Sequence, residues 1–428
     1  MNRKTKNKRN KKQLKIGLLY ICMLLTLFLT ACNLVNKNNN ESKSAISATE
    51  TKNESTKSSN ENMSQENTTS SASTAQMLEQ QVQQKLSSMT LEEKVAQIFV
   101  VTPEALTGYE IVTVAGDATR NALRKYPVGG IVYFGLNIKT PEQLKAMTGN
   151  TQKYAQEIEG MPLFLGIDEE GGTIARIGNN INFKVKKYSD MASIGAIKDY
   201  EKAYEVGQTI GGYLNSYGLN LDFAPDADVL TNPGNTVIGN RSFGNDGKLV
   251  AKMDLKVAQG LSDNHVLSCF KHFPGHGATQ GDTHEGFAYT NKTLEELKKS
   301  ELVPFQAASD NNIPFIMISH ISVPNVIGNN TPSSLSKIMI TDILRGQMGY
   351  NGIIITDSMS MGAIVNNYGI KDAVIQSLQA GVDMILMPQD FLAAYQGVLD
   401  AVGNGTISEQ RINESLERIL RVKLKMSN

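Results

Sequence analysis

Short apolar runs rich in Ile, Val and Phe recur along residues 76–428, and most of them are followed by a stretch with helical periodicity. Continuous apolar runs of this kind are typical of strands buried on both faces of a parallel sheet, with helices as the crossovers. Eight runs are predicted to be strands: 97–101, 129–135, 162–168, 219–225, 266–272, 314–320, 352–357 and 383–387. The pattern therefore predicts an α/β fold, a (β/α)8 TIM barrel formed by a single domain.

Helical periodicity fills most of the intervals between these strands. Helices are predicted at 141–158, 201–217, 249–264, 294–311, 336–348, 370–380 and 392–402, with a leading helix at 77–89 and a closing helix at 408–425. The interval 102–128 has the least regular pattern. A doubly wound open sheet is the alternative arrangement, and it is disfavoured because no dinucleotide-type glycine loop opens a helix.

The N-terminal segment has the pattern of an export signal. Residues 3–15 carry eight Lys and Arg, and residues 16–30 are almost wholly apolar. This run is shorter than the roughly 20 residues that span a bilayer, whereas a basic start and a short apolar run are typical of a secretory signal. It ends in Leu29-Thr30-Ala31-Cys32, which resembles a bacterial lipobox. We therefore expect a lipoprotein signal peptide at 1–31 and a lipid anchor on Cys32, which would hold the protein on the extracytoplasmic face of the cell membrane. An ordinary signal peptide with a chance cysteine is the alternative.

Residues 33–75 consist mostly of Asn, Ser, Thr, Lys and Glu, with hardly any aromatic or branched apolar residue. Such a segment cannot bury enough apolar surface to offset the entropy lost on ordering. We expect a disordered polar tether that begins at the lipidated Cys32, with a root-mean-square reach of about 35 Å. The catalytic domain would then occupy residues 76–428.

Charge and cysteine content restrict the function further. Removal of residues 1–31 takes eight of the 42 Lys and Arg and none of the 42 Asp and Glu, so the remaining chain has a formal net charge of −8. Nucleic acid is therefore not an expected partner, because its binding needs a basic face. Cys269 is then the one cysteine besides Cys32, and we expect it in the core, with no internal disulfide and no metal site built from cysteines. We expect a monomer.

Polar residues follow the apolar runs at the places where the strands end. In a (β/α)8 barrel the active site lies at the C-terminal ends of the strands. The residues to consider there are Asp168, Asp222, Asp226, Asp228, Lys271, His272, His320 and Asp357. Their position predicts a polar pocket suited to a carbohydrate.

A glycine-rich segment after the fifth run combines several chemically useful side chains. Lys271 and His272 can donate hydrogen bonds to sugar hydroxyls at the strand end. A loop then carries Asp282 and His284, and an Asp beside a His can support the imidazolium, which makes the His a usable acid and base. A zinc site made of His272, His276, Asp282 and His284 is the rival interpretation. It is disfavoured because it leaves Lys271 and Asp357 without roles.

The seventh run, Ile353-Ile354-Ile355-Thr356, ends in Asp357. A carboxylate at the end of a buried strand is costly unless it is paired or functional. A retaining glycosidase needs a carboxylate nucleophile on one side of the sugar and a proton donor near the other. A helix N-cap is the structural alternative for Asp357.

Together, these segments resemble glycoside hydrolase family 3, in its N-acetylhexosaminidase branch (the NagZ type), over about residues 85–425. The motifs Lys271–Gly277 and Asp357–Met361 are highly specific, and the pair Asp282-x-His284 marks this branch. The resemblance implies that Asp357 is the nucleophile and that His284, paired with Asp282, is the acid and base. It implies sugar-binding roles for Asp168, Arg176, Arg241, Lys271 and His272.

Two departures from the family pattern concern the same site. Thr173 stands where family members often have an Arg, and Glu285-Gly286-Phe287-Ala288 stands where a Pro often follows the Asp-x-His pair. The chain also lacks the second domain of many relatives, so we expect the barrel and its loops to supply the whole site.

The resemblance implies a retaining exo-β-N-acetylglucosaminidase (β-N-acetylhexosaminidase) that acts on peptidoglycan or related glycans, with no metal and no organic cofactor. A family 3 β-glucosidase and a β-N-acetylglucosaminide phosphorylase are the alternatives within the enzyme class. A neutral His repels an incoming phosphate less than a carboxylate would, which keeps the phosphorylase open. The alternative from another class is a muropeptide-binding lipoprotein without catalysis.

Overall fold

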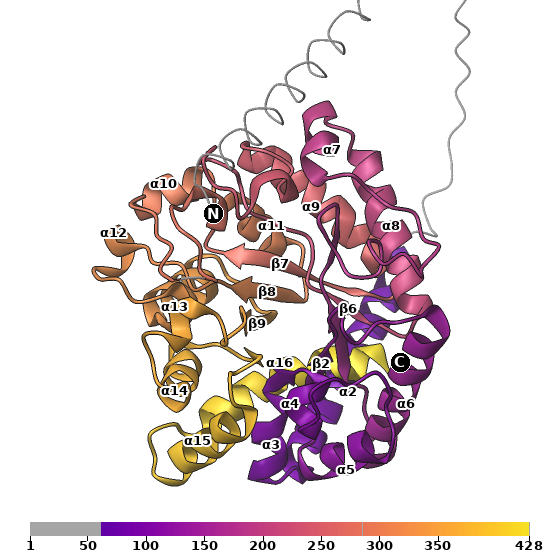
Figure 1. Cartoon of the computed structure of the whole chain (residues 1–428). Coiled ribbons are helices and arrows are strands. Elements are labelled where there is room, and N and C mark those ends of the chain that lie inside the picture. Colours follow the sequence, from indigo (N-terminus) through magenta and orange to yellow (C-terminus); the bar gives the residue numbers. More distant parts are fainter. Residues whose placement is uncertain (1–60, 285, 428) are drawn as a thin grey trace, which may run out of the picture. The chain divides into compact units, whose positions relative to one another are not determined.

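The computed structural model describes residues 61–427 except Glu285, and of residues 61–74 the backbone alone. Eight strands form one parallel sheet in the order β10-β1-β2-β3-β6-β7-β8-β9. A parallel bridge between Ile355 and Met384 joins the two ends of this order and closes the barrel, which helices surround (Figure 1). The strands are β1 (Phe99–Val101), β2 (Gly130–Val132), β3 (Phe164–Ile167), β6 (Leu221–Asp222), β7 (Leu267–Phe273), β8 (Phe315–Ile318), β9 (Ile353–Thr356) and β10 (Ile385–Leu386).

The prediction of a (β/α)8 barrel is confirmed, and every predicted strand contains or overlaps one of these eight strands. Their side chains are buried almost throughout, as expected for strands that lie between a packed barrel interior and a layer of helices.

The helices are α2 (Glu61–Ser88), α3 (Leu91–Gln97), α4 (Pro103–Thr107), α5 (Asp117–Lys125), α6 (Pro141–Glu159), α7 (Met191–Ile197), α8 (Tyr200–Ser216), α9 (Gly247–Ser262), α10 (Leu294–Lys299), α11 (Val303–Asp310), α12 (Pro324–Ile327), α13 (Gly362–Val365), α14 (Ile370–Ala380), α15 (Phe391–Gly403) and α16 (Glu409–Met426). Short 3-10 helices occupy η1 (Gly239–Arg241), η2 (His276–Ala278) and η3 (Ser333–Leu335), and η4 (Ile338–Gln347) is a π-helix.

One predicted helix needs correction, and the structure also describes two segments for which the sequence analysis made no clear prediction. The helix predicted at 294–311 is two helices, because Pro304 lacks the N–H that a helix interior requires and lies instead in the first turn of α11. The irregular interval 102–128 holds α4 and α5, and α4 ends at Gly108 with a φ of 77°. A small antiparallel hairpin of β4 (Glu169–Gly171) and β5 (Ile174–Ala175) follows β3 and was not predicted.

The structure covers only part of the N-terminal segment for which predictions were made. Helix α2 begins at Glu61, so residues 61–75 are helical although the sequence analysis assigned them to the tether. The signal peptide, Cys32 and the rest of the tether lie outside the described residues. Within the described part of the chain, no helix is long and apolar enough to cross a membrane.

Buried ion pairs fix the end of the barrel opposite the strand C-termini. Asp383, just before β10, is fully buried; it accepts a hydrogen bond from the Ile354 backbone N–H at 2.9 Å and pairs with Arg345. Arg418 of α16 lies 3.1 Å from its other oxygen. Asp383 thereby joins the closing helix α16 to β9 and β10 at this end of the barrel. The predicted site residues lie at the other end, where the strands have their C-termini.

Candidate active site

Polar side chains gather at the C-terminal ends of neighbouring strands. Asp168 follows β3, Lys271 and His272 lie near the end of β7, and Asp357 follows β9 directly. The strands that carry them are close in the sheet order β3-β6-β7-β8-β9. The barrel therefore brings together residues that lie far apart in the sequence; Lys271 Nζ, for example, lies 2.9 Å from an oxygen of Asp168, 103 positions away.

Four of the predicted sugar-binding residues belong to one network with a fifth residue, Glu170. Lys271 Nζ lies 2.9 Å from Asp168 Oδ1 and 2.7 Å from Glu170 Oε1. Arg241 binds Glu170 through two bonds, Nε to Oε2 at 2.9 Å and Nη2 to Oε1 at 2.8 Å. Arg176 Nη2 lies 3.3 Å from Asp168 Oδ2. We call Asp168, Glu170, Arg176, Arg241 and Lys271 the acid–cation network.

Glu170 is the member that the sequence analysis missed. Burial opposes its ionisation, but the charges of Arg241 and Lys271 hold its pKa well below the usual range. Glu170 is only 4% exposed, so its ionised carboxylate pairs with Arg241 and Lys271 inside the protein and has little contact with solvent. Its place two residues after Asp168, on β4, was a signal that sequence reasoning could have used.

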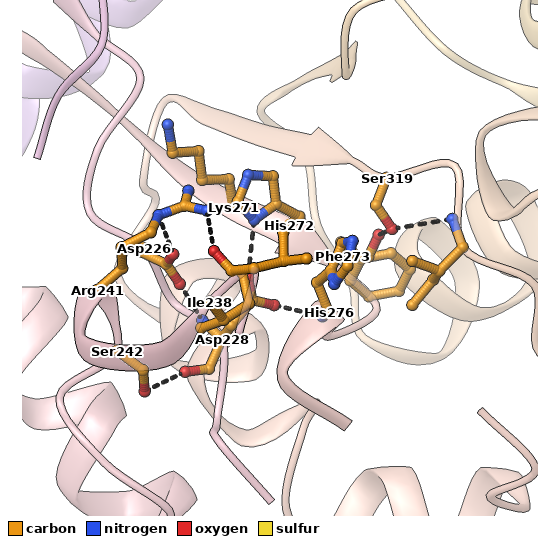
Figure 2. Close-up of polar contacts among 12 residues, drawn as sticks. Asp226, Asp228, Ile238, Arg241, Ser242, Lys271, His272, Phe273, His276 and Ser319 are labelled. Atoms are coloured by element: carbon orange, nitrogen blue, oxygen red, sulfur yellow. Dashed lines mark hydrogen bonds and ion pairs between the residues drawn. The ribbon is translucent and has the colours of Figure 1, made fainter. Parts of the chain in front are cut away.

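Two further acids support the other side of the site (Figure 2). Asp226 Oδ2 lies 3.1 Å from Arg241 Nε, and Asp228 Oδ2 lies 2.7 Å from His272 Nδ1. The other oxygen of Asp228 accepts the backbone N–H of His276. Asp228 therefore acts as an acceptor, and we assign the proton of His272 to Nδ1, which leaves Nε2 free to meet a ligand.

The electrostatics of His272 follow from burial. Desolvation, together with the nearby Arg241, lowers the pKa of His272 to about 4. The imidazole is therefore neutral at neutral pH. Burial raises the pKa of Asp228, and burial raises that of Asp226 to about 8 in spite of Arg241.

Asp357 is partly buried at the end of β9, and its surroundings favour the ionised carboxylate. Its backbone N–H donates to the Ile318 carbonyl at 2.8 Å, and its Oδ1 accepts the Ser358 N–H at 2.7 Å. Burial alone would raise its pKa, but His272, His320 and this N–H donor lower it below the usual value. The N-cap alternative receives no support, since the next helix, α13, has Met361 at its N-cap.

His320 fixes the backbone beside Asp357. Its Nδ1 lies 2.7 Å from Ser334 Oγ and its Nε2 lies 2.9 Å from the Ser358 carbonyl oxygen. Because a carbonyl only accepts, Nε2 carries the proton and Nδ1 accepts from the serine. His320 is fully buried and positions the turn after β9.

The Asp282–His284 pair forms a dyad on an exposed loop. His284 Nδ1 lies 2.7 Å from Asp282 Oδ1, and the same oxygen accepts the His284 backbone N–H at 2.9 Å. The His284 side chain is 65% exposed. Backbone N–H groups at the start of α13 donate to the carbonyls of Thr283 and His284, at 3.1 and 3.3 Å. The dyad loop is thus attached to the element that follows Asp357.

A metal ion was the rival interpretation for this region. Among the described residues, Asp226, Asp228 and His272 bring one ligand atom each to within 4.8 Å of one another. This group contains neither His276 nor His284, and the adjacent guanidinium of Arg241 disfavours a further cation. His276 instead bonds through its ring nitrogens to two threonine hydroxyls, at 3.0 and 3.2 Å.

Comparisons with known proteins find relatives over most of the chain. A sequence profile described as "Glycosyl hydrolase family 3 N terminal domain" matches residues 90–422. Beta-hexosaminidase A of Pseudoalteromonas piscicida is 32% identical over 330 residues, which cover 71% of this chain and 54% of that protein. Beta-hexosaminidase LpqI of Mycobacterium tuberculosis is 31% identical over 339 residues, or 77% of this chain and 82% of that one.

The same likeness appears in three dimensions. A solved glycoside hydrolase family 3 beta-N-acetylglucosaminidase from Paenibacillus sp. str. FPU-7 is similar, with a TM-score of 0.74 and 35% identity. The similarity covers 79% of this chain and 63% of that one. The chain thus spans just over half of the Pseudoalteromonas protein, under two thirds of the Paenibacillus structure and most of the mycobacterial relative.

The burial of His272 predicts its protonation state. NMR of the protein with labelled histidine should show neutral His272 with its proton on Nδ1 from about pH 8 down to about pH 5, because its pKa is lowered to about 4. The signal is assigned by its loss in His272→Asn. An imidazolium signal for His272 near pH 6 would contradict the buried, Asp228-paired geometry.

Proposed function

The chain belongs to glycoside hydrolase family 3, and from that premise we propose that it is an exo-acting β-N-acetylhexosaminidase which removes terminal β-linked N-acetylglucosamine with retention of configuration. The observation that carries the proposal is the partly buried carboxylate of Asp357 at the C-terminal end of β9, whose pKa is lowered, followed by α13, to which the Asp282–His284 loop is hydrogen-bonded. The relatives named beta-hexosaminidase support the choice of sugar.

In the first step, Asp357 attacks the anomeric carbon while the glycosidic bond to the leaving oxygen breaks. His284, protonated on both nitrogens, gives its Nε2 proton to that oxygen and remains bonded through Nδ1 to Asp282. The products are the free leaving group and a glycosyl ester of Asp357. The neighbouring donors that keep Asp357 ionised also make it a good leaving carboxylate in the next step.

In the second step, neutral His284 accepts a proton from water at Nε2, and the water oxygen bonds to the anomeric carbon as the ester to Asp357 breaks. Asp282 stabilises the imidazolium that forms. Burial raises the pKa of Asp282, but the backbone N–H and the imidazole of His284 lower it overall, which keeps it ionised for this role. A histidine base also avoids placing a second anion beside Asp357.

The acid–cation network would hold the sugar. Asp168 offers acceptors to hydroxyl groups, while Lys271 and Arg176 beside it offer donors. The free Nε2 of neutral His272 can accept a hydrogen bond from a sugar hydroxyl. Ion pairs among these groups fix their positions before the sugar arrives, so less order is lost on binding.

Peptidoglycan fragments or related wall glycans are the proposed substrates. A β-glucosidase or a phosphorylase would share most of this machinery. Turnover of a chromogenic N-acetylglucosaminide, beside the matching glucoside and with or without phosphate, separates the three. A muropeptide-binding lipoprotein without catalysis has no use for the Asp282–His284 dyad, and it would turn over none of these compounds.

Loss of the buried anion under the cations should weaken sugar binding. Glu170→Gln removes the charge that Arg241 and Lys271 share, and we expect kcat/KM to fall by about tenfold, mainly through KM, because charge-assisted hydrogen bonds contribute about 1.5–3 kcal/mol. Steady-state kinetics and a thermal melt test this. The control is Glu157→Gln, which breaks the exposed ion pair with Arg120. An unchanged KM in a folded Glu170→Gln protein would refute the role.

If His284 is the proton donor, the effect of its loss should depend on how much protonation the leaving group needs. His284→Ala should lower kcat by about 10²–10⁴-fold for a substrate with a poor leaving group and much less for a dinitrophenyl glycoside, which departs without protonation. His265→Asn is the matched control, since this exposed residue has a φ of 59° that Asn tolerates. Equal losses for both substrates would exclude His284 as the proton donor.

Membrane anchoring is a separate proposal. We infer from the lipobox that Cys32 is acylated after cleavage of residues 1–31. Cys32→Ala should move the protein from the membrane fraction to the soluble or secreted fraction, with mass spectrometry of the N-terminal peptide as the direct measurement. A wild-type N-terminal peptide without lipid would end this proposal and leave the glycosidase proposal intact.

A further inference from the structure

Three loops at the active-site end of the barrel expose large apolar side chains. They follow β1, β2 and β3, and their exposed apolar side chains form what we call the apolar rim: Tyr109, Ile111, Val114, Leu136 and Ile181, which are 62, 63, 68, 46 and 91% exposed. Among the described residues, 11 large apolar side chains are exposed, and five of them lie on these three loops. A cluster of exposed apolar side chains indicates a binding surface, whereas single exposed apolar residues are common on soluble domains.

Hydrogen bonds join the three loops into one surface. Asn137 Nδ2 of the second loop donates to the Val112 carbonyl of the first at 2.9 Å. Asn182 Nδ2 of the third donates to the Lys139 carbonyl of the second at 2.8 Å. The rim residues are therefore presented by a cross-bonded scaffold and are not the tips of independent loops.

The rim adjoins the sugar site. Phe134 lies at the start of the second loop. The guanidinium carbon Cζ of Arg176 lies over its ring, 5.6 Å from the ring centroid. The Phe134 backbone N–H is bonded to Asn137 Oδ1 at 2.8 Å. Whatever binds the apolar rim is thereby placed beside the mouth of the barrel.

Cations border the apolar side chains. Lys139 lies in the second loop, and Lys184 and Lys187 follow Ile181 in the third; all three are exposed, and none of them forms an ion pair with another described residue. The exposed acids nearby are Glu110 in the first loop and Asp117 and Glu142 in the first turns of α5 and α6, which follow the first and second loops. The third loop is therefore the most basic part of the rim, in a chain whose net charge is −8 once residues 1–31 are removed.

We propose that the apolar rim and its lysines bind the surface of an anionic lipid bilayer. Exposed aliphatic and Tyr side chains can enter the boundary between headgroups and acyl chains, and lysines there extend their amines to anionic headgroups. The lipid anchor inferred at Cys32 would bring the domain to such a surface, and the rim would form a second contact. The mouth of the barrel would then lie at the membrane, independently of the sugar that it accepts.

The absence of tryptophan from the whole sequence gives a clean test. The full-length lipidated chain with Ile181→Trp is reconstituted on vesicles of phosphatidylcholine with or without phosphatidylglycerol. With phosphatidylglycerol, we expect a blue shift of the emission relative to detergent-free buffer and strong quenching by lipids brominated on their acyl chains. The matched control is Met77→Trp, at a 54% exposed position on α2.

The outcomes separate the possibilities. Stronger quenching of Ile181→Trp than of Met77→Trp, reduced by adding Lys184→Glu and Lys187→Glu, supports the proposal. Equal or absent quenching in vesicle-bound protein contradicts it, and so does failure of the chain to sediment with the vesicles. Quenching that is indifferent to phosphatidylglycerol refutes the anionic part. Glycosidase activity in solution should be unchanged in all three variants: Ile181→Trp, Met77→Trp, and Ile181→Trp with both lysine substitutions.

Discussion

An ionised carboxylate at the end of a buried strand is the constraint on which the rest of this structure depends. Desolvation makes such a charge unfavourable, so it persists only where nearby donors and positive charge compensate. Around Asp357 this compensation comes from the Ser358 N–H, from the positive charge of Lys271 and from the polar imidazoles of His320 and His272. Both imidazoles are fixed in turn: His320 by Ser334, and His272 by Asp228.

The same need for compensation explains why buried acids lie against the cations of the site. Lys271 and Arg241 remain charged although both are largely buried, because the ionised Glu170 pairs with both of them. The cost of burying this many charges is offset only if the network is complete, which makes the geometry specific. The Asp282–His284 dyad is exposed instead of buried. In the proposed mechanism His284 changes its protonation state during the reaction, and for this it needs access to water.

Much of the fold and part of the site could be predicted from the sequence. Continuous apolar runs marked all eight strands because a buried parallel sheet allows no polar face, and the polar residues that end those runs had to lie at one rim. Glu170 was missed although its place two residues after Asp168 was a usable signal, whereas the partners of Asp226 and Asp228 could not be predicted, since they depend on how the chain folds after β6 and β7. The break at Pro304 could have been read from the sequence, but the start of α2 at Glu61 could not, because residues 61–75 are mostly polar and show no apolar periodicity.

The central claim is that Asp357 forms the covalent bond to the sugar. Incubation with a mechanism-based 2-fluoro N-acetylglucosaminide probe, followed by peptide mapping, tests it most directly. The account predicts a stable adduct on the peptide that contains Asp357 and no adduct in Asp357→Asn. A label on any other residue, or turnover of the probe without a covalent adduct, would contradict it.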